Sequence, residues 1–501
     1  MAHIAFISIC DRNAQGQRLM SAALRRHGHE CSIIFLKPYP AGRQSATEPD
    51  PDPFSWIGID RRGRAFRYAA PPPFTGRELD LLRLVLENVR PDAIGMTVNT
   101  PLRRLNARVA RFIRTFSSVP LIWGGYDPTV NAGDCIEYCD FVCIGEGDTA
   151  ILEIAGCIDA SRPLHQVRNL AWRQGDSLVR NARAPLVTDL DSLPWRDNSA
   201  GNKYFIDGDR IIESCSALND RPPGSYQTIT SRGCPYLCSY CCEASLKDLY
   251  RGEKFLRRRS PADCVAELAA AKAEFRITDV VFEDEIFAMH QRWLEEFASL
   301  YREQIGLPFS AYLYPTRNIE NLLPLLKSAG LKSCSVSLQS GSPRINKEVF
   351  NRVFDRNLFL RTVWLCKTYD IDFYTDVITF NPYEEERDLQ DTLEVLLDAE
   401  GAYGLCVNKL FVLPGTPLAE RLAGDGKKLD DPARDALFGY YSRLFWIASF
   451  SPLSKWALRI IQRRNLFRRK PHWIPMGLLD WLLPVASEVH RVVNVIRLAT
   501  T

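Results

Sequence analysis

The sequence predicts an α/β protein in which a doubly wound parallel sheet is followed by a partial (βα)6 barrel and a small helical region. Two stretches of the chain lead to this prediction, because in each of them short apolar runs alternate with longer helical patterns. Crossovers of helical length between strands require those strands to be parallel. The 501 residues suffice for two or three domains, and 46% hydrophobic with 25% charged residues is typical of globular proteins.

The first stretch, residues 1 to about 160, predicts the doubly wound domain. Strands are expected at residues 4–9, 31–36, 93–97, 121–123 and 141–144. Helices are expected between them at residues 17–27, 78–88 and 102–116. The proline-rich stretch 38–73 interrupts the alternation and is expected to be a long loop or insertion.

A connector is expected at residues 161–224, with a hairpin at 170–179, packing the two halves of the chain together. The second alternating stretch, residues 225 to about 430, predicts the barrel. Its strands are expected at residues 227–230, 279–282, 309–313, 333–338, 373–380 and 405–411, with helices such as 261–275 and 322–329. In barrels of this type the chemistry lies at the carboxyl ends of the strands.

The tail, residues 431–501, is helical in pattern, aromatic and basic. From residue 451 onward it carries nine lysines and arginines against two acidic residues. Helices that cap the barrel with a solvated basic face are favoured over a membrane-surface or lipid-binding element. The chain has no apolar run of 18 residues and no secretory leader pattern, so its fifteen cysteines are expected to be reduced thiols in the cytoplasm.

Three cysteines, Cys234, Cys238 and Cys241, stand at CxxxCxxC spacing directly after the expected first strand of the barrel. Thiolates are soft ligands suited to iron–sulfur clusters. Three of them on one loop can hold three irons of a 4Fe–4S cube and leave the fourth iron free. Structural cysteines or a zinc site are the alternative, but zinc needs a fourth ligand and no second CxxC follows.

This spacing resembles that of the radical S-adenosylmethionine (SAM) superfamily, in which the free iron binds SAM. Tyr240, just before the last cysteine, would pack near the adenine of SAM. The segment 281–287 is similar to the "FxDDxF" of cobalamin-linked members. The resemblance implies that Asp284 and Glu285 face the cleft and accept hydrogen bonds from the ammonium group of SAM.

The resemblance continues along the barrel. Arg317, after the third strand, matches an arginine that would contact the SAM carboxylate or the substrate, with a surface arginine as the alternative. Gln339 and Ser340 lie in a segment similar to the family's "GxESG" or "QSGS" element, which would hydrogen-bond the ribose or amino group of SAM. Residues 381–385 replace the family's glycine-containing "GxPgET", so the close backbone approach to SAM at that motif is not implied here.

The loop after the first strand carries Asp11, Asn13 and Gly16 at the spacing of DxHxxG, the corrinoid-binding motif. Asn13 stands where the motif has the histidine that coordinates cobalt. An amide is a poor ligand for cobalt(III), so no lower axial ligand is expected. Weak lower ligation is compatible with methyl transfer.

Further matches to the cobalamin-binding members follow. Thr97 occupies the place of the family's SxL, Gly124 and Gly125 resemble its GG turn, and residues 145–148 match its "GEGE". The resemblance therefore implies that residues 1–160 are a cobalamin-binding Rossmann-like domain and that the chain is similar to class B radical SAM methyltransferases. A domain that keeps this fold without the corrinoid is the alternative.

The function implied is methylation of an unactivated carbon of a small-molecule, lipid or natural-product substrate, through a 5′-deoxyadenosyl radical and methylcobalamin. The cofactors would be a 4Fe–4S cluster, SAM and cobalamin, and flavodoxin or ferredoxin would supply electrons. Radical cyclisation of a porphyrin-like or lipid substrate, RNA methylthiolation and a non-catalytic corrinoid sensor are the alternatives. No nucleic-acid partner is expected. No nucleophile pair such as Ser/His is evident, so the catalytic residues are not assigned.

Overall fold

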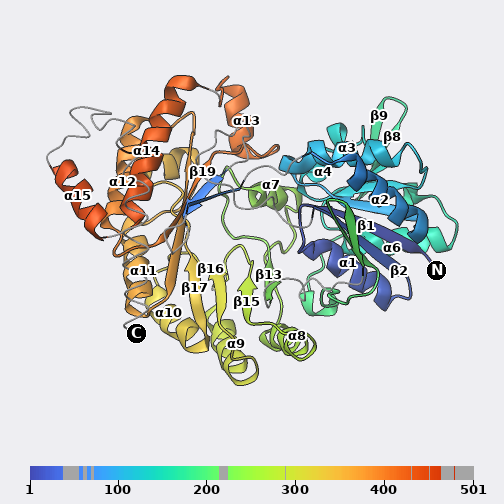
Figure 1. The fold of residues 1–501 in the computed structure, drawn as a ribbon, viewed down its shortest axis with the longest axis horizontal. Helices are drawn as coiled ribbons and strands as arrows, with labels where there is room; N and C mark the ends of the chain where they lie inside the picture. Colours follow the sequence, from blue (N-terminus) through green and yellow to red (C-terminus); the bar gives the residue numbers. More distant parts are fainter. Residues whose placement is uncertain are drawn as a thin grey trace.

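The computed structural model describes residues 1–37, 56–59, 65–68, 73–213, 224–287, 289–429, 431–450, 452–463 and 479. These residues form two halves that lie side by side (Figure 1). One half is built on a nine-stranded sheet and the other on an eight-stranded sheet. The short helix α7 (Cys242–Leu249) lies between the halves.

The centre of the first sheet is parallel, as the alternation of the first stretch predicted. Its strands lie in the order β2-β1-β5-β6-β7. They are β1 (His3–Ile9), β2 (Glu30–Leu36), β5 (Ala93–Thr97), β6 (Leu121–Gly124) and β7 (Phe141–Cys143). Both faces of these strands are buried, which explains why they are apolar almost throughout.

Helices cover both faces of this sheet. One apolar cluster joins it to α2 (Gly76–Val89) and α3 (Arg103–Ile113), and another joins it to α1 (Gln15–Arg26) and α6 (Asp148–Asp159). The short helices α4 (Tyr126–Val130) and α5 (Ala132–Cys135) follow β6. The doubly wound prediction is therefore confirmed.

Residues 161–224 extend the first sheet at both of its edges. The predicted hairpin is present as β8 (Leu170–Gln174) and β9 (Ser177–Arg180), beside β7. A second hairpin, β10 (Lys203–Asp207) and β11 (Arg210–Glu213), was not predicted and lies beside β2 at the other edge. This segment therefore adds four strands to the first half.

The second sheet contains six consecutive parallel strands, as predicted for the barrel. They are β12 (Ser225–Thr228), β15 (Asp279–Phe282), β16 (Phe309–Tyr312), β17 (Leu331–Ser335), β18 (Asp372–Thr379) and β19 (Gly404–Lys409). Helices line the outside of the sheet in Figure 1: α8 (Pro261–Glu274), α9 (Gln291–Gln304), α10 (Ile319–Ala329), α11 (Arg356–Thr368) and α12 (Glu386–Asp398).

A hairpin from the proline-rich insertion completes the second sheet. The strands β3 (Trp56–Ile59) and β4 (Ala65–Tyr68) are antiparallel, and β3 pairs with β19. Of the two expectations for this stretch, a long loop or an insertion, these eight residues therefore agree with an insertion. The rest of 38–72 lies outside the described part of the chain. The open edge of a partial barrel leaves backbone groups of β19 unpaired, and the hairpin provides partners for them.

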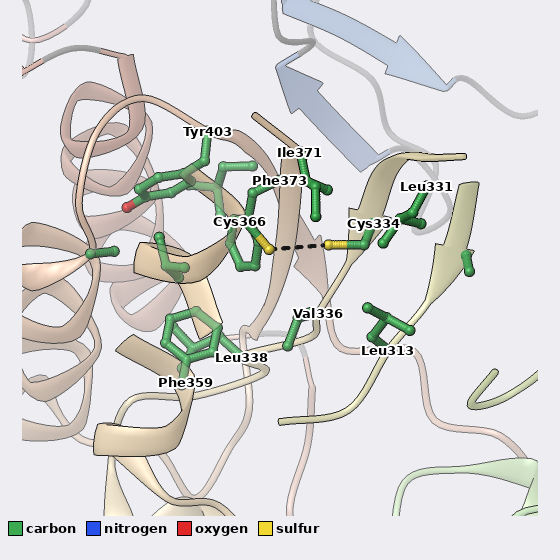
Figure 2. Packing of buried hydrophobic residues seen from close by; sticks show 14 of the residues in the cluster. Leu313, Leu331, Cys334, Val336, Leu338, Phe359, Cys366, Ile371, Phe373 and Tyr403 are labelled. Carbon is green, nitrogen blue, oxygen red and sulfur yellow. Dashed lines mark hydrogen bonds between the residues drawn. The ribbon is translucent and has the colours of Figure 1, made fainter. Parts of the chain in front are cut away.

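The barrel core contains thiols as well as hydrocarbon side chains. Figure 2 shows Cys334 of β17 and Cys366 of α11 pointing toward each other, with their sulfur atoms 3.5 Å apart. Both side chains are fully buried among residues such as Leu338, Phe359 and Phe373. They pack as small apolar residues, in contrast to the cysteines of the 231–241 loop.

The described part of the tail packs on the barrel, as the capping interpretation expected. Buried aromatic side chains of α14 (Pro432–Phe450) join the barrel core. The next helix, α15 (Pro452–Arg463), leaves Leu453 and Trp456 exposed. Most of the basic tail lies beyond residue 463, outside the described residues. None of the described helices combines the length and apolarity needed to cross a membrane.

Lys455 attaches α15 to the end of α12. Its ammonium group donates a hydrogen bond to the carbonyl of Ala399 and lies 4.4 Å from the ring centroid of Tyr403. Burial lowers the pKa of Lys455 to about 7. Since the unfolded chain keeps the ordinary lysine pKa near 10.5, it binds more protons than the folded chain between these two values, and stability must rise with pH there.

We expect the free energy of unfolding to rise between about pH 7 and pH 10, by up to about 1.4 kcal/mol per pH unit from this residue. Urea unfolding of the wild-type chain and of Lys455→Met at several pH values measures the difference. The same series on Lys367→Met, whose exposed ammonium pairs with Glu400, is the control. Equal pH slopes for the wild type and Lys455→Met would contradict the prediction.

Candidate active site between the two halves

The three cysteines lie on a loop at the carboxyl end of β12, where the barrel prediction placed them. The loop starts with β13 (Ser231–Arg232), which pairs with β14 (Arg257–Arg258), and ends at α7. Between strand and cysteines, Gly233 has φ +87°, and a Cβ there would lie 2.6 Å from the carbonyl oxygen of Phe255. Only glycine allows this close approach of the two backbones.

Contacts with residues after β17 hold the middle of the loop. The backbone N–H of Ser239 donates to the carbonyl of Phe350 at 2.8 Å, and its hydroxyl donates to that of Val349 at 2.5 Å. The ring of Tyr240 lies edge-on to Phe350, with centroids 4.9 Å apart. Tyr240 is thus a packing residue of the loop in this structure.

The sulfur atoms of the loop lie in a desolvated environment. Burial raises the pKa of the Cys234 thiol to about 12 and that of Cys238 above its usual value. The hydrogen bond with Cys242 and burial both raise the pKa of Cys241. Bound iron would reverse this effect by favouring the thiolates. Among the described residues, no three His, Cys, Asp or Glu side chains converge on one ion, whereas a cluster needs only one thiolate per iron.

The acidic side chains of the segment after β15 point in two directions, one toward the buried start of the cysteine loop and the others toward the cleft. The carboxylate of Asp284, only 1% exposed, accepts hydrogen bonds from the Thr230 backbone at 2.9 Å, from the Thr230 hydroxyl at 2.7 Å and from the Ser231 hydroxyl. The prediction that Asp284 faces the cleft was wrong, because its carboxylate is turned toward the Thr230 backbone and the hydroxyls of Thr230 and Ser231. Glu285 does line the cleft, together with Glu283, which the motif match missed.

We expect Asp284→Ala to lower the free energy of unfolding by about 2–3 kcal/mol, because it leaves the buried Thr230 N–H without an acceptor. Glu285→Ala, in the same segment but exposed, should change it by less than about 0.5 kcal/mol. Urea denaturation of the two variants beside the wild type measures both values. A similar loss in both variants would show that Asp284 does not hold the loop.

Unpartnered polar atoms gather after β17 and β18. The buried Oε1 of Gln339 and Nε of Arg352 have no hydrogen-bond partner, and neither has Nδ2 of Asn381 or Oε2 of Glu384. Arg352 is 9% exposed and donates from Nη2 to the Ser337 carbonyl at 2.6 Å. Its charge and its hydrogen bond to Cys238 partly oppose the rise that burial causes in the pKa of that thiol. Arg352 belongs to none of the motifs recognised in the sequence.

Two other predicted SAM contacts lie elsewhere. Arg317 is exposed on the loop after β16. Ser340 is completely buried, and its hydroxyl lies 3.2 Å from the backbone nitrogen of Ser342 and 3.4 Å from the hydroxyl of Thr392 in α12. Ser340 therefore joins the end of β17 to α12 and is not available to a ligand.

Arg18 holds the loop after β1 through hydrogen bonds to backbone carbonyl groups of that loop. This fully buried guanidinium donates to the carbonyls of Arg12 at 3.3 Å, Asn13 at 2.8 Å and Asp197 at 3.0 Å. The backbone N–H of Asn13 donates to the carboxylate of Asp11 at 2.9 Å. Burial lowers the pKa of Arg18 to about 9. The corrinoid-motif residues thus lie on a loop whose shape does not depend on a histidine.

A cleft of about 400 Å³, here called the interdomain cleft, separates the two halves. From the first half it is lined by residues that include Gln15, Gly16, Gly125 and Gly145. The barrel contributes the start of the cysteine loop, the first turn of α7 and both glutamates after β15. Across it, the Gln15 amide donates to the Glu283 carboxylate at 2.6 Å. Thr97 and Gly124 end neighbouring strands but are not among the lining residues.

Comparison with known proteins agrees with this arrangement. Residues 228–396 match the model of the radical SAM superfamily. The chain is 23% identical over 269 residues to the uncharacterized methyltransferase PH0819 of Pyrococcus horikoshii, covering 52% of this chain and 54% of that protein. It is 23% identical over 332 residues to the anaerobic magnesium-protoporphyrin IX monomethyl ester cyclase of Cereibacter sphaeroides, covering 62% and 50%. The chain thus spans about half the length of these curated relatives.

A solved structure extends the similarity to both halves. The radical SAM methyltransferase TsrM of Kitasatospora setae, with cobalamin and a [4Fe-4S] cluster bound, superimposes with a TM-score of 0.63 at 17% identity over 85% of this chain and 78% of TsrM. At this identity the likeness shows the fold. Residues 228–396 are therefore a radical SAM domain, and the chain as a whole has the same two-part fold as TsrM.

Proposed function

We propose that the protein is a cobalamin-dependent radical SAM enzyme that methylates an unactivated carbon of a small molecule. The observation that supports this most directly is the interdomain cleft, which brings the glycine-lined loops of the first half opposite the cysteine loop. When bound, the cluster and SAM supply a 5′-deoxyadenosyl radical, and the corrinoid supplies the transferable methyl group. The residues present fit each of these groups.

The groups that would bind the cluster and SAM lie on segments that follow strands of the barrel. Cys234, Cys238 and Cys241 would hold three irons. The free Nε of the buried Arg352 and the free Oε1 of Gln339 would meet the carboxylate and the amino or ribose groups of SAM, which removes the cost of leaving these polar atoms unpaired. Glu285 would face the positive charge of SAM from the cleft wall.

For the corrinoid, the first half offers space and no competing ligand. Gly16, Gly125 and Gly145 line the cleft. A Cβ at Gly16 would meet no atom within 4 Å, so the absence of a side chain there leaves space for a planar ring. No histidine is among the described residues that line it, in keeping with Asn13 at the motif's histidine position. The chain's own contribution is to orient the bound groups and exclude water between the halves.

The decisive experiment is anaerobic reconstitution of the full chain with iron, sulfide and hydroxocobalamin. We expect about four irons and one corrinoid per chain, and release of 5′-deoxyadenosine from SAM with dithionite. A corrinoid content near zero would exclude methyl transfer through cobalamin. The relative from Cereibacter sphaeroides makes radical cyclisation the second candidate; product analysis with candidate substrates, by the gain of one methyl group or the loss of two hydrogens, separates the two reactions.

A further inference from the structure

Four charged side chains join the two halves along the interdomain cleft; we call them the arginine clamp. Arg232 donates from Nη1 and Nη2 to the carboxylate of Asp148 at 2.7 and 3.0 Å, and from Nη1 to Glu146 at 3.1 Å. Arg257 donates from Nη1 and Nη2 to Glu146 at 3.0 and 2.5 Å. Both arginines belong to the barrel half and both carboxylates to the first half. Such two-pronged pairs fix direction as well as distance.

The clamp is connected by short stretches of chain to both cofactor loops. Arg232 is followed directly by Gly233 and Cys234, and Arg257 lies on the strand paired with it. Glu146 and Asp148 follow Gly145, which lines the cleft at the end of β7. A displacement of one carboxylate would therefore be transmitted to the first cluster ligand through no more than two residues.

The clamp itself is held in place. Arg257 is 1% exposed and donates further hydrogen bonds to the carbonyls of Val187 and Phe255. The backbone N–H of Glu146 donates to the Tyr250 hydroxyl at 2.7 Å, and the Glu146 carbonyl accepts from Asn169 at 2.7 Å. Charged side chains fixed in this way lose little entropy when they pair, unlike surface ion pairs.

The middle of the interdomain cleft is open. Because its middle holds about 400 Å³ of space instead of packed side chains, the relative position of the two loops depends on contacts at the rim. The clamp, the Gln15–Glu283 hydrogen bond and the hydrogen bond from the Tyr126 hydroxyl to the Pro414 carbonyl at 2.8 Å are such contacts. We propose that Arg232 and Arg257, through Glu146 and Asp148, are positioning residues that set the distance between the cluster loop and the corrinoid loop; their role in the reaction rests on the function proposed above.

The test compares Arg232→Met with Arg168→Met, which removes an ion pair with Glu153 that lies within the first half. In the reconstituted chain we expect Arg232→Met to keep its iron and its 5′-deoxyadenosine formation within about twofold. Its corrinoid-dependent conversion of SAM to S-adenosylhomocysteine should fall about tenfold or more, because that reaction needs both loops in register. Pulsed electron paramagnetic resonance between cob(II)alamin and the reduced cluster should show a broader distance distribution. Arg232→Lys, which keeps the charge but not the fork, should be intermediate.

A second measurement needs no cofactor. Hydrogen exchange of the cofactor-free chain should become faster in Arg232→Met at residues 145–148 and 231–241 alike, and should stay unchanged in Arg168→Met. Unchanged exchange at 145–148 would overturn the clamp whatever the activity of the chain. Loss of iron and 5′-deoxyadenosine in proportion to S-adenosylhomocysteine would also overturn it, since Arg232 would then support only its own loop. A wild-type chain that binds no corrinoid contradicts the proposed function, and the exchange result still decides on the clamp.

Discussion

Cys238→Ala is expected to abolish both the iron–sulfur absorbance and the formation of 5′-deoxyadenosine. The loop offers three thiolates at this spacing, and each would hold a different iron of a four-iron cluster. With one ligand removed, a second iron is left without a protein donor and the cluster is released or degraded. We expect less than about a tenth of the wild-type iron after anaerobic desalting, and 5′-deoxyadenosine at the background level.

Cys242→Ala is the matched control, because it removes a neighbouring thiol that the cluster does not need. Cys242 begins α7 and lies in hydrogen-bonding contact with Cys241. Iron content and 5′-deoxyadenosine formation in this variant should remain within about twofold of the wild type. If Cys238→Ala retains its cluster while Cys242→Ala loses it, the ligand set is different from the one proposed here.

The positions of the strands along the chain and the place of the cysteine loop could be predicted because both depend on local sequence. Apolar runs of strand length identify β1, β2, β5, β6 and β7, and the connections between them are long enough for the helical crossovers that parallel strands need. The cysteine spacing is also local, since all three thiols lie within eight residues. These predictions needed no knowledge of how distant parts of the chain meet.

The features that were missed depend on contacts between distant residues. The two four-residue strands β3 and β4 are too short to be recognised in a proline-rich context, and they are stabilised by β19, more than 300 residues later in the chain. The arginine clamp joins residues about 85–110 positions apart. Glu283 and Asp284 lie beyond the end of β15, so the alternation of strand residues does not decide which of them faces the cleft.

Arg352 and Arg317 show most clearly why a motif match is insufficient. Arg317 follows the third barrel strand, where related chains have an arginine, but its side chain is exposed. Arg352 lies beyond a turn after β17 and is brought to the cluster loop by the fold, where its guanidinium lies 4.9 Å from the ring centroid of Tyr314 and beside Cys238. A buried cation with a free N–H next to the cluster is the better partner for a carboxylate.

We therefore expect Arg352→Met to weaken SAM binding by about 100-fold, the loss typical of a buried, hydrogen-bonded charge pair, while Arg317→Met changes it by less than about threefold. Equilibrium dialysis of SAM against the reconstituted chain measures both. Because Arg352 also holds the Ser337 carbonyl, iron content and the free energy of unfolding must be measured beside affinity. If Arg352→Met binds SAM weakly but keeps a full cluster and near-normal stability, Arg352 is the residue that binds the SAM carboxylate. If Arg317→Met instead binds SAM more weakly than Arg352→Met, Arg317 is the residue that binds the SAM carboxylate, as the motif match implied.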